Sequence, residues 1–189
     1  MVESSGHVYA FEPDPDNHAI LLRNIALNAY DNVVAARMAV SNRVGTGTLY
    51  LTALDSGRHS MYHHGLPERG QLAVETTTID SYLGSKGWPR VDVAKIDVEG
   101  AEISVLEGMS QLLEISDDLK LIIEFNPSLL TSAGVLPMQF LEKPSSLGFK
   151  VFVIDEDHGL SHLAANDAPA LVKRLLSTED SVNLLCKRH

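Results

Sequence analysis

The stretch VDVAKIDVEGAE, residues 91–102, decides the fold and also raises the question of function. Its apolar, β-branched beginning predicts a buried strand over residues 90–96, and three acids follow within six residues: Asp97, Glu99 and Glu102. Acids suit a solvated helix start, because the first turn of a helix carries a partial positive charge. They equally suit an active site at the end of a strand. The stretch alone leaves both interpretations open.

Strand and helix patterns alternate on both sides of this stretch, which predicts an α/β fold. Strands are expected at residues 7–12, 32–40, 45–54, 71–79, 90–96, 119–125, 149–154 and 181–187. Helices are expected after a cap at Asp16 or Asn17, after a cap at Asp80, and over residues 99–113, 137–147 and 169–176. The 189 residues show no internal repeat or linker, so we expect a single domain over residues 1–189.

Charge and composition argue against several classes of function. A formal net charge of −10 disfavours nucleic acid as a partner, because phosphate binding needs Lys and Arg to replace counterions. There is no run of about 18 apolar residues that would predict a membrane span. The first residues, MVESSGHVYAFEP, lack the basic and apolar regions of a signal peptide. The single cysteine, Cys186, fits a core position and a reducing cytosol, so we expect a cytoplasmic protein.

The strand ends are the places to look for a site, because ligands of open α/β sheets bind at the carboxyl ends of the strands. Four of these ends are polar, at Glu12, at Ser41 and Asn42, at Asp97, and at Glu124 and Asn126. An acid such as Glu12 can hold both hydroxyls of a ribose, but it can equally precede a capped helix. Asp97 ends a buried strand, which favours a site residue, whereas Glu102 is better explained as a helix-start acid.

Two further features concern buried charge and a long loop. A buried Glu124 needs a partner, which could be a metal, Lys95, a backbone amide or a substrate hydroxyl. Lys95 is better explained by a structural ion pair than by a catalytic amine. The loop 55–71 carries His59, His63 and His64. The spacing of these histidines would suit a metal site only on a helix, and no helix is predicted here. We therefore interpret the segment as a mobile loop that covers substrate.

Six ordered blocks of the sequence resemble the FkbM family of S-adenosylmethionine-dependent methyltransferases. They are VYAFEPDPDN, LLRNIALN, VVAARMAVSN, TTTIDSYL, VDVAKIDVEGAEISVLEG and LIIEFNP, and they span Gly6 to Pro127. The resemblance implies a Rossmann-like class I methyltransferase fold, with a mostly parallel twisted sheet flanked by helices and an antiparallel last strand. It also implies methyl transfer from S-adenosylmethionine to a hydroxyl of a small natural product, sugar or lipid-like acceptor.

The resemblance assigns the cofactor residues by position. Glu12, followed by Pro13, falls at the acid that holds the cofactor ribose. The segment 38–41 falls beside the adenine, where apolar side chains and backbone groups frame the base; its members are Met38, Ala39, Val40 and Ser41.

The resemblance also places Asp97 beside the transferable methyl group and the acceptor. Asp97 would accept the proton of the acceptor hydroxyl as a general base, with Glu99 and Glu124 as candidates for orienting that hydroxyl. A divalent cation held by Asp97, Glu124 and Asn126 is a less favoured route, and we assign no metal ligand.

One family feature is missing from this sequence. The first strand and its glycine-rich turn, D-x-G-A-N-x-G, would precede Gly6, where only MVESS stands, so we expect an N-terminally truncated fold. The missing strand would lie between the strands that end at Glu12 and Asp97. Either these two strands pair directly, or another segment of the chain or a partner chain fills the space between them. A strand edge left exposed there would favour a homo-oligomer.

Two alternatives to an enzyme of this family follow from the residues. The absent turn makes a non-catalytic binding or interaction module on the same scaffold the main alternative function. A nucleotide-dependent oxidoreductase is weaker, because no G-x-G-x-x-G lies between a strand and a helix.

Overall fold

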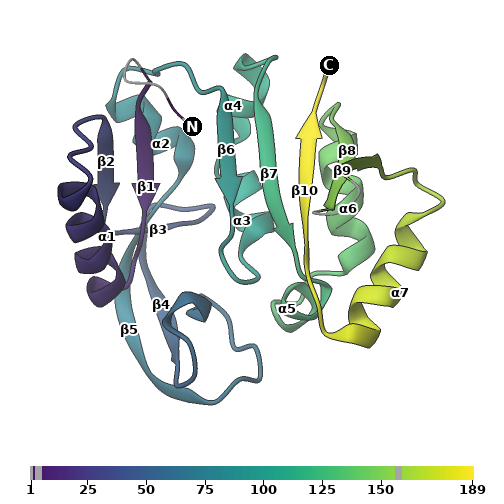
Figure 1. The fold of residues 1–189 in the computed structure, drawn as a ribbon, viewed down its shortest axis with the longest axis horizontal. Coiled ribbons are helices and arrows are strands. Elements are labelled where there is room, and N and C mark those ends of the chain that lie inside the picture. Colours follow the sequence, from purple (N-terminus) through teal and green to yellow (C-terminus); the bar gives the residue numbers. More distant parts are fainter. Residues whose placement is uncertain (1, 3–5, 156–158) are drawn as a thin grey trace.

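A computed structural model of the chain describes residues 2, 6–155 and 159–189. The described strands form three sheets, with orders β6-β7-β10-β8-β9, β1-β2 and β3-β5-β4 (Figure 1). Their bounds are β1 (Val8–Phe11), β2 (Val33–Ala36), β3 (Ala39–Val40), β4 (Gly45–Thr52), β5 (Glu68–Thr77), β6 (Val93–Ile96), β7 (Lys120–Phe125), β8 (Lys150–Asp155), β9 (Gly159–His162) and β10 (Val182–Lys187). The mixed α/β architecture confirms the predicted fold class.

The five-stranded sheet holds most of the core. β6 and β7 run parallel, whereas β10 pairs antiparallel with both β7 and β8, so the last strand is antiparallel as expected. Alternate residues of β7 and β10, including Leu121, Ile123, Leu184 and Cys186, are fully buried, which confirms the core position predicted for Cys186. Burial raises the pKa of the Cys186 thiol to about 12.

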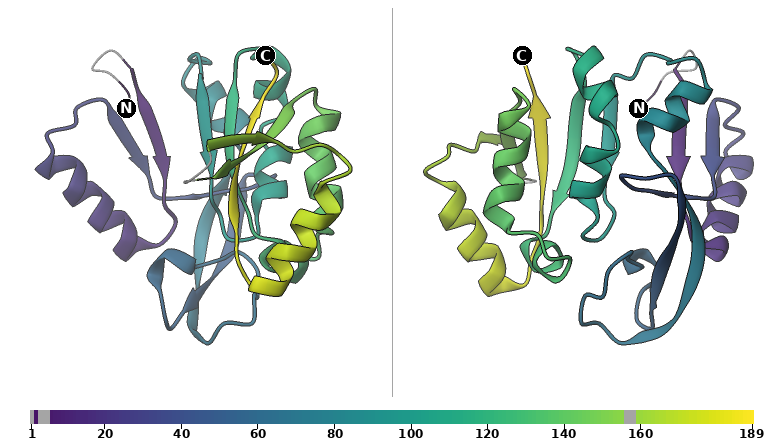
Figure 2. Two further views of the ribbon diagram at one scale, coloured as in Figure 1. Left: turned by 45° about the vertical axis from the view of Figure 1, so that its right-hand side comes forward. Right: turned by 180° about the vertical axis from the view of Figure 1, so that it is seen from behind.

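Helices flank these sheets. α3, α4 and α6 cover one face of the five-stranded sheet, as the view from behind shows (Figure 2). The helices are α1 (Pro15–Leu27), η1 (Ser56–Arg58, a 3-10 turn), α2 (Ile79–Ser85), α3 (Glu102–Glu107), α4 (Ser110–Ile115), α5 (Pro127–Ser132), α6 (Pro137–Ser146) and α7 (Ala168–Thr178). Within the described residues, no helix combines the length and apolar character needed to cross a bilayer.

The β1-β2 pair and α1 stand apart from the five-stranded sheet (Figure 2). Val8 and Glu12 donate their backbone N–H groups to the β2 side, so the backbone groups of Tyr9 and Phe11 face the gap toward β6. β1 and β6 belong to different sheets, and no strand of the described ranges lies between them. Two of the three options, direct pairing and another described segment in the slot, are therefore wrong. β6 is also less buried than predicted, with Val93 51% exposed at the open edge.

Two helix caps differ from the prediction. The cap of α1 is Asp14, because its Oδ1 accepts the backbone N–H groups of both Asp16 and Asn17 at 2.9 Å. The cap of α2 is Thr78, whose hydroxyl accepts a backbone N–H of the first turn at 2.9 Å. Asp80 instead caps α4, where it accepts two backbone N–H groups at 2.8 and 3.0 Å. Both caps lie before the predicted residue: Asp14 directly precedes Pro15, the first residue of α1, and Thr78 lies two residues before Asp80.

Two predicted elements are each divided in the structure. The strand expected at 32–40 ends as β2 at Ala36, and Ala39 and Val40 pair with β5 in a different sheet. The helix expected from Glu99 is divided at Gly108 into α3 and α4. A Cβ on Gly108 would overlap the carbonyl oxygen of Ser41, so glycine allows α3 to pack directly on the chain that follows β3.

Candidate active site

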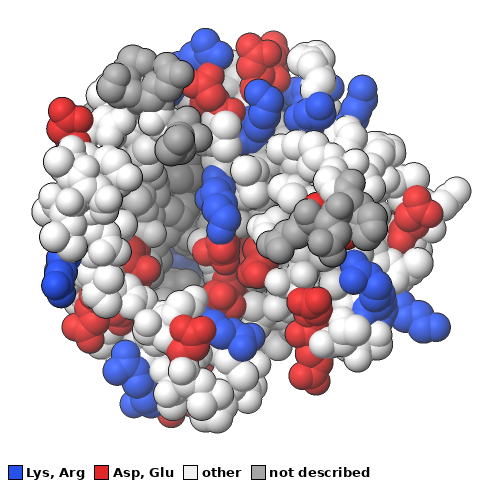
Figure 3. All heavy atoms as spheres, in the orientation of Figure 1, with Lys and Arg blue, Asp and Glu red and all other residues white. Residues whose placement is uncertain are grey.

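A pocket lies where β1 and β6 end, at the edge expected for ligands of such sheets. Figure 3 shows a hollow on this face with acidic side chains gathered beside it. The predicted cofactor residues that line the pocket are Glu12, Pro13, Ala39, Val40 and Asp97; the other lining residues are Phe11, Asn17, Met38, Leu49, Ser56, Gly57, His59, Met61, Val98, Glu99 and Ala101. Ser41 lines a polar pocket of about 410 Å³ that shares Met61 and Ala101 with the first.

Glu12 is held in place at the end of β1. Its backbone N–H donates to the carbonyl of Ala36 at 3.1 Å, and its Oε1 accepts the backbone N–H of Asp14 at 2.8 Å. Burial raises the pKa of the Glu12 carboxyl, although the Asp14 N–H opposes the shift. The half-buried carboxylate therefore has a fixed position in the pocket, and among the described residues none donates to its second oxygen, which can accept hydrogen bonds from a ligand.

The loop between β4 and β5 forms the opposite wall of the pocket. Asn17 donates to the carbonyl of Ser56 at 2.8 Å, which ties the loop to α1. The His59 side chain is only 4% exposed; its Nδ1 accepts the backbone N–H of Thr52 at 3.2 Å, and its Nε2 lies 3.9 Å from Asp14 Oδ2. Burial lowers the pKa of His59, so the ring is neutral near pH 7. The loop predicted to cover substrate thus lines the pocket, and β5 begins at Glu68, earlier than predicted.

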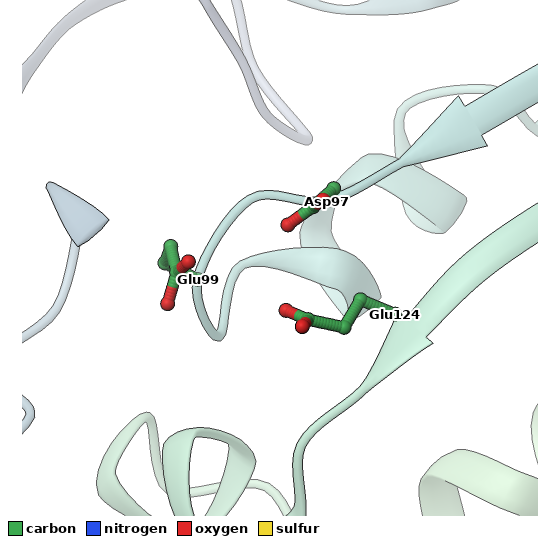
Figure 4. A group of neighbouring side chains, drawn as sticks. All are labelled: Asp97, Glu99 and Glu124. Carbon is green, nitrogen blue, oxygen red and sulfur yellow. The ribbon is translucent and has the colours of Figure 1, made fainter. Parts of the chain in front are cut away.

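Three acids gather at the ends of β6 and β7. Asp97 and Glu99 lie on the loop after β6, and Glu124 comes from β7 (Figure 4). Oxygen atoms of the three carboxylates lie within 4.8 Å of one another. Such oxygens could be bridged by one cation, but an acidic cluster alone does not assign a metal. His63 and His64 of the neighbouring loop contact Glu68 and the carbonyl of Arg58 instead of joining this cluster.

Glu99 is the most perturbed acid of the cluster. Burial, together with the charges of Glu124 and Asp97, raises its pKa to about 7, against the opposing charge of Arg58. Its backbone has a φ of 51°, a left-handed conformation that is strained for a residue with a side chain. Strain and a pKa near neutrality in one residue are typical of functional sites.

The other two acids of the cluster, Asp97 and Glu124, each contact a neighbouring side chain. Lys95 Nζ lies 2.6 Å from Asp97 Oδ2, which confirms the ion pair expected for Lys95. Ser181 donates its hydroxyl to Glu124 Oε1 at 2.8 Å, a partner that was not predicted. Burial raises the pKa of Glu124 and the Ser181 hydrogen bond opposes the shift. The charge of Lys95, which was among the four predicted partners, also acts on Glu124 and opposes the rise in its pKa.

Glu102 begins α3, as predicted, but it is 3% exposed rather than solvated. Its Oε1 accepts the backbone N–H groups of Gly100 at 3.1 Å and Val98 at 3.4 Å, so it supports the turn that carries Glu99. Gly100 has a φ of 99°, and a Cβ there would lie 3.1 Å from the carbonyl oxygen of Leu129. Glycine at this position therefore allows the two backbones to approach closely.

Comparison with known proteins gives the family. The Methyltransferase FkbM domain family matches residues 1–151 of the chain. The chain belongs to this family. It is 29% identical over 114 residues to the hexuronic acid methyltransferase AglP of Haloferax volcanii, which covers 60% of this chain and 46% of that protein. It is also 29% identical over 133 residues to methyltransferase sdnD of Sordaria araneosa, which covers 55% of this chain and 51% of that protein.

The fold of this FkbM-family chain matches a solved structure. The crystal structure of methyltransferase FkbM from Methylobacillus flagellatus KT superposes with a TM-score of 0.52 at 13% identity, covering 96% of this chain and 36% of the other. At that identity the match concerns the fold alone. The chain spans about half the length of the curated relatives that it matches.

Proposed function

We propose that this chain is the site-bearing part of an S-adenosylmethionine-dependent O-methyltransferase that acts on a hydroxyl of a small, sugar-like acceptor. The observation that carries the proposal is one pocket, which is lined by an acid at the end of β1, by an apolar segment at β3, and by two acids of the cluster, Asp97 and Glu99. Family membership supports the reaction class, and the positions of the lining residues support the roles proposed for them below.

The lining residues fit the nucleoside part of the cofactor. Glu12 would accept hydrogen bonds from the ribose hydroxyls, because its carboxylate is fixed at the mouth of the pocket. Met38, Ala39 and Val40 offer an apolar wall to the adenine ring, and Leu49 is a further apolar lining residue. When bound, S-adenosylmethionine supplies an electrophilic methyl group on a positively charged sulfur. The carboxylates of the acidic cluster favour a positive charge at this end of the pocket.

Glu99 is the best candidate for the general base. A base works best when its pKa lies near the working pH, and the pKa of Glu99 is about 7. Asp97 was the first choice from the sequence, but its carboxylate already pairs with Lys95 at 2.6 Å. We therefore assign the acceptor proton to Glu99, with Asp97 and Glu124 orienting the acceptor hydroxyl.

A sugar-like acceptor is supported by the relative from Haloferax volcanii, whose name gives a hexuronic acid as its substrate. The wall beyond Met61 is rich in hydroxyl and amide groups, including Ser41, Asn42, Tyr50 and Ser104. Such groups suit an acceptor with several hydroxyls, because each can exchange hydrogen bonds with one of them.

The test is methyl transfer from isotopically labelled S-adenosylmethionine to a panel of acceptors, namely hexuronic acids, neutral sugars and small hydroxylated lipids. Labelled hexuronic acid or neutral sugar is the expected product. Cofactor binding is measured separately by isothermal titration with S-adenosylmethionine and S-adenosylhomocysteine. Absence of both heat and transfer would contradict the proposal for this chain.

Replacing Glu12 with glutamine is expected to weaken cofactor binding by tenfold or more, about 1.4 kcal/mol. The amide keeps one acceptor oxygen but loses the charge that strengthens the hydrogen bonds from the ribose hydroxyls. Isothermal titration measures the change, and Asp31→Asn, at an exposed acid, is the control for charge alone. Equal affinity in Glu12→Gln and the wild-type chain would place the ribose elsewhere.

A non-catalytic binding module is the second candidate function. The open edges of β1 and β6 favour it, because the described residues supply no strand to pair with them. Exposed strand edges recruit partner chains, so a dimer in light scattering together with no cofactor binding would support this function. A monomer that binds the cofactor would count against it.

A further inference from the structure

Ser60 is a buried residue at the centre of the loop between β4 and β5. It is 1% exposed, and its backbone is bound to β4 through two hydrogen bonds with Tyr50, at 2.8 and 3.2 Å. The position of its side chain is therefore fixed by the sheet rather than by the loop around it.

The Ser60 hydroxyl joins this loop to the acidic cluster. Its Oγ accepts the backbone N–H of Tyr62 at 3.1 Å and donates to the carbonyl oxygen of Glu99 at 2.6 Å. Because the Tyr62 N–H occupies an acceptor site of Oγ, the hydroxyl proton is directed to Glu99. The bond spans 39 residues of sequence.

The Glu99 peptide needs such support. A φ of 51° is unfavourable for a residue with a Cβ, and Gly100 continues the turn with a φ of 99°. Glu102 accepts the backbone N–H groups of Gly100 and Val98 in this turn. Ser60 holds the carbonyl group of Glu99, and loss of this bond would let the turn relax and the Glu99 side chain move toward water.

We propose that Ser60 is a positioning residue, whose hydroxyl holds the Glu99 peptide so that the Glu99 carboxylate stays with those of Asp97 and Glu124. This role rests on the proposed function, in which Glu99 takes the acceptor proton. Ser60 itself touches neither acceptor nor cofactor in this scheme. It acts through the orientation and the burial of Glu99.

The first readout needs no activity. The Glu99 carboxyl is titrated by ¹³C NMR and assigned by the loss of its signal in Glu99→Gln. The charged groups that act on it are Asp97, Glu124 and Glu102, which raise its pKa, and Arg58, which lowers it. Ser60→Ala is expected to lower the pKa of Glu99 by about one unit, because the relaxed side chain is better solvated.

The variants separate the hydroxyl from side-chain volume. Ser60→Thr keeps the hydroxyl donor and is expected to titrate like the wild-type chain. Ser60→Cys is close to threonine in volume but has only a weak S–H donor, so it is expected to behave like Ser60→Ala. If Ser60→Ala does not fold, the Thr and Cys variants give the same comparison. Ser146→Ala removes an exposed hydroxyl that also donates to a backbone carbonyl, at 2.7 Å, and serves as the control.

The second readout is methyl transfer. Ser60→Ala is expected to lower turnover about tenfold while the KM for S-adenosylmethionine stays unchanged, because the cofactor residues are untouched. An unchanged Glu99 titration in Ser60→Ala and Ser60→Cys would overturn the role of Ser60. Absence of transfer in the wild-type chain would contradict the proposed function instead, and the NMR titration would still decide whether Ser60 positions Glu99.

Discussion

Glu99→Gln is expected to lower methyl transfer at pH 8 by about 100-fold or more, the usual loss when a general base is removed. Glutamine keeps the size of the side chain and one acceptor oxygen, but it cannot take the proton of the acceptor hydroxyl. The left-handed backbone at Glu99 is unchanged by this substitution, so folding and cofactor binding should be preserved. The measurement is turnover at saturating cofactor and acceptor.

The pH dependence of the methyl-transfer rate tests the role of Glu99 most directly. With a pKa of about 7, Glu99 is mostly protonated at pH 6 and mostly ionised at pH 8. The wild-type rate should therefore rise with pH through about 7 and then level off, and Glu99→Gln should lose this rise.

Controls identify the base among the three acids. Glu114→Gln alters an exposed acid on α4 and is expected to change neither rate nor profile. A Glu99→Gln variant with the wild-type rate and profile would move the base to Asp97 or Glu124, which Asp97→Asn and Glu124→Gln would then distinguish.

The strand ends were the part of the site that sequence could predict. Glu12 and Asp97 each follow an apolar run directly, and parallel strands bring their carboxyl ends to one edge. Glu124 lies one strand further along the same edge. Local patterns therefore placed these acids near one another without any knowledge of long-range contacts.

The remaining site residues depend on contacts that local patterns do not encode. His59 and Ser60 lie in a loop that the sequence predicted to be mobile and to cover substrate, without assigning a role to either residue. Their roles come from the pairing of Ser60 with Tyr50 and from burial beside Asp14. A buried serine within SGRHSMYHHG has no periodic signal that would distinguish it from a solvated one.

The acidic cluster has a stability cost that the fold must offset. Glu99 combines an unfavourable φ with partial burial near two other carboxylates, and each of these destabilises the folded state. Buried contacts around the turn compensate, notably those of Glu102 and Ser60. A cluster that costs stability and is still held from two sides is better explained by chemistry than by packing.

Gly108→Ala is expected to lower the free energy of unfolding by about 3 kcal/mol, the upper part of the range for overpacking. A Cβ at this position would overlap the carbonyl oxygen of Ser41, and a backbone oxygen cannot rotate away as a side chain can. The junction is also held by Asn42 Nδ2, which donates to Glu107 Oε2 at 2.9 Å, and by the Asp80 N–H, which donates to the Gly108 carbonyl at 3.0 Å. Relief of the overlap must therefore disturb several hydrogen bonds.

Thermal and urea unfolding measure this effect, and the melting temperature should fall by about 6–12 °C. Gly84→Ala is the matched control, because Gly84 lies within α2 and a Cβ there would meet Trp88 at an ordinary distance of 3.6 Å. Alanine at position 84 should leave stability unchanged or raise it by up to about 1 kcal/mol. Equal stability of Gly108→Ala and Gly84→Ala would show that α3 does not pack on Ser41 this closely.

The same substitution connects the fold to the pocket. Ser41 directly follows Ala39 and Val40, which belong to the apolar wall proposed for the adenine. A Cβ at Gly108 would displace the Ser41 backbone and, with it, these two residues. Cofactor affinity in Gly108→Ala should therefore fall even at temperatures where the variant is fully folded, whereas Gly84→Ala should bind as the wild-type chain does. Loss of stability without loss of affinity would instead place the adenine away from β3.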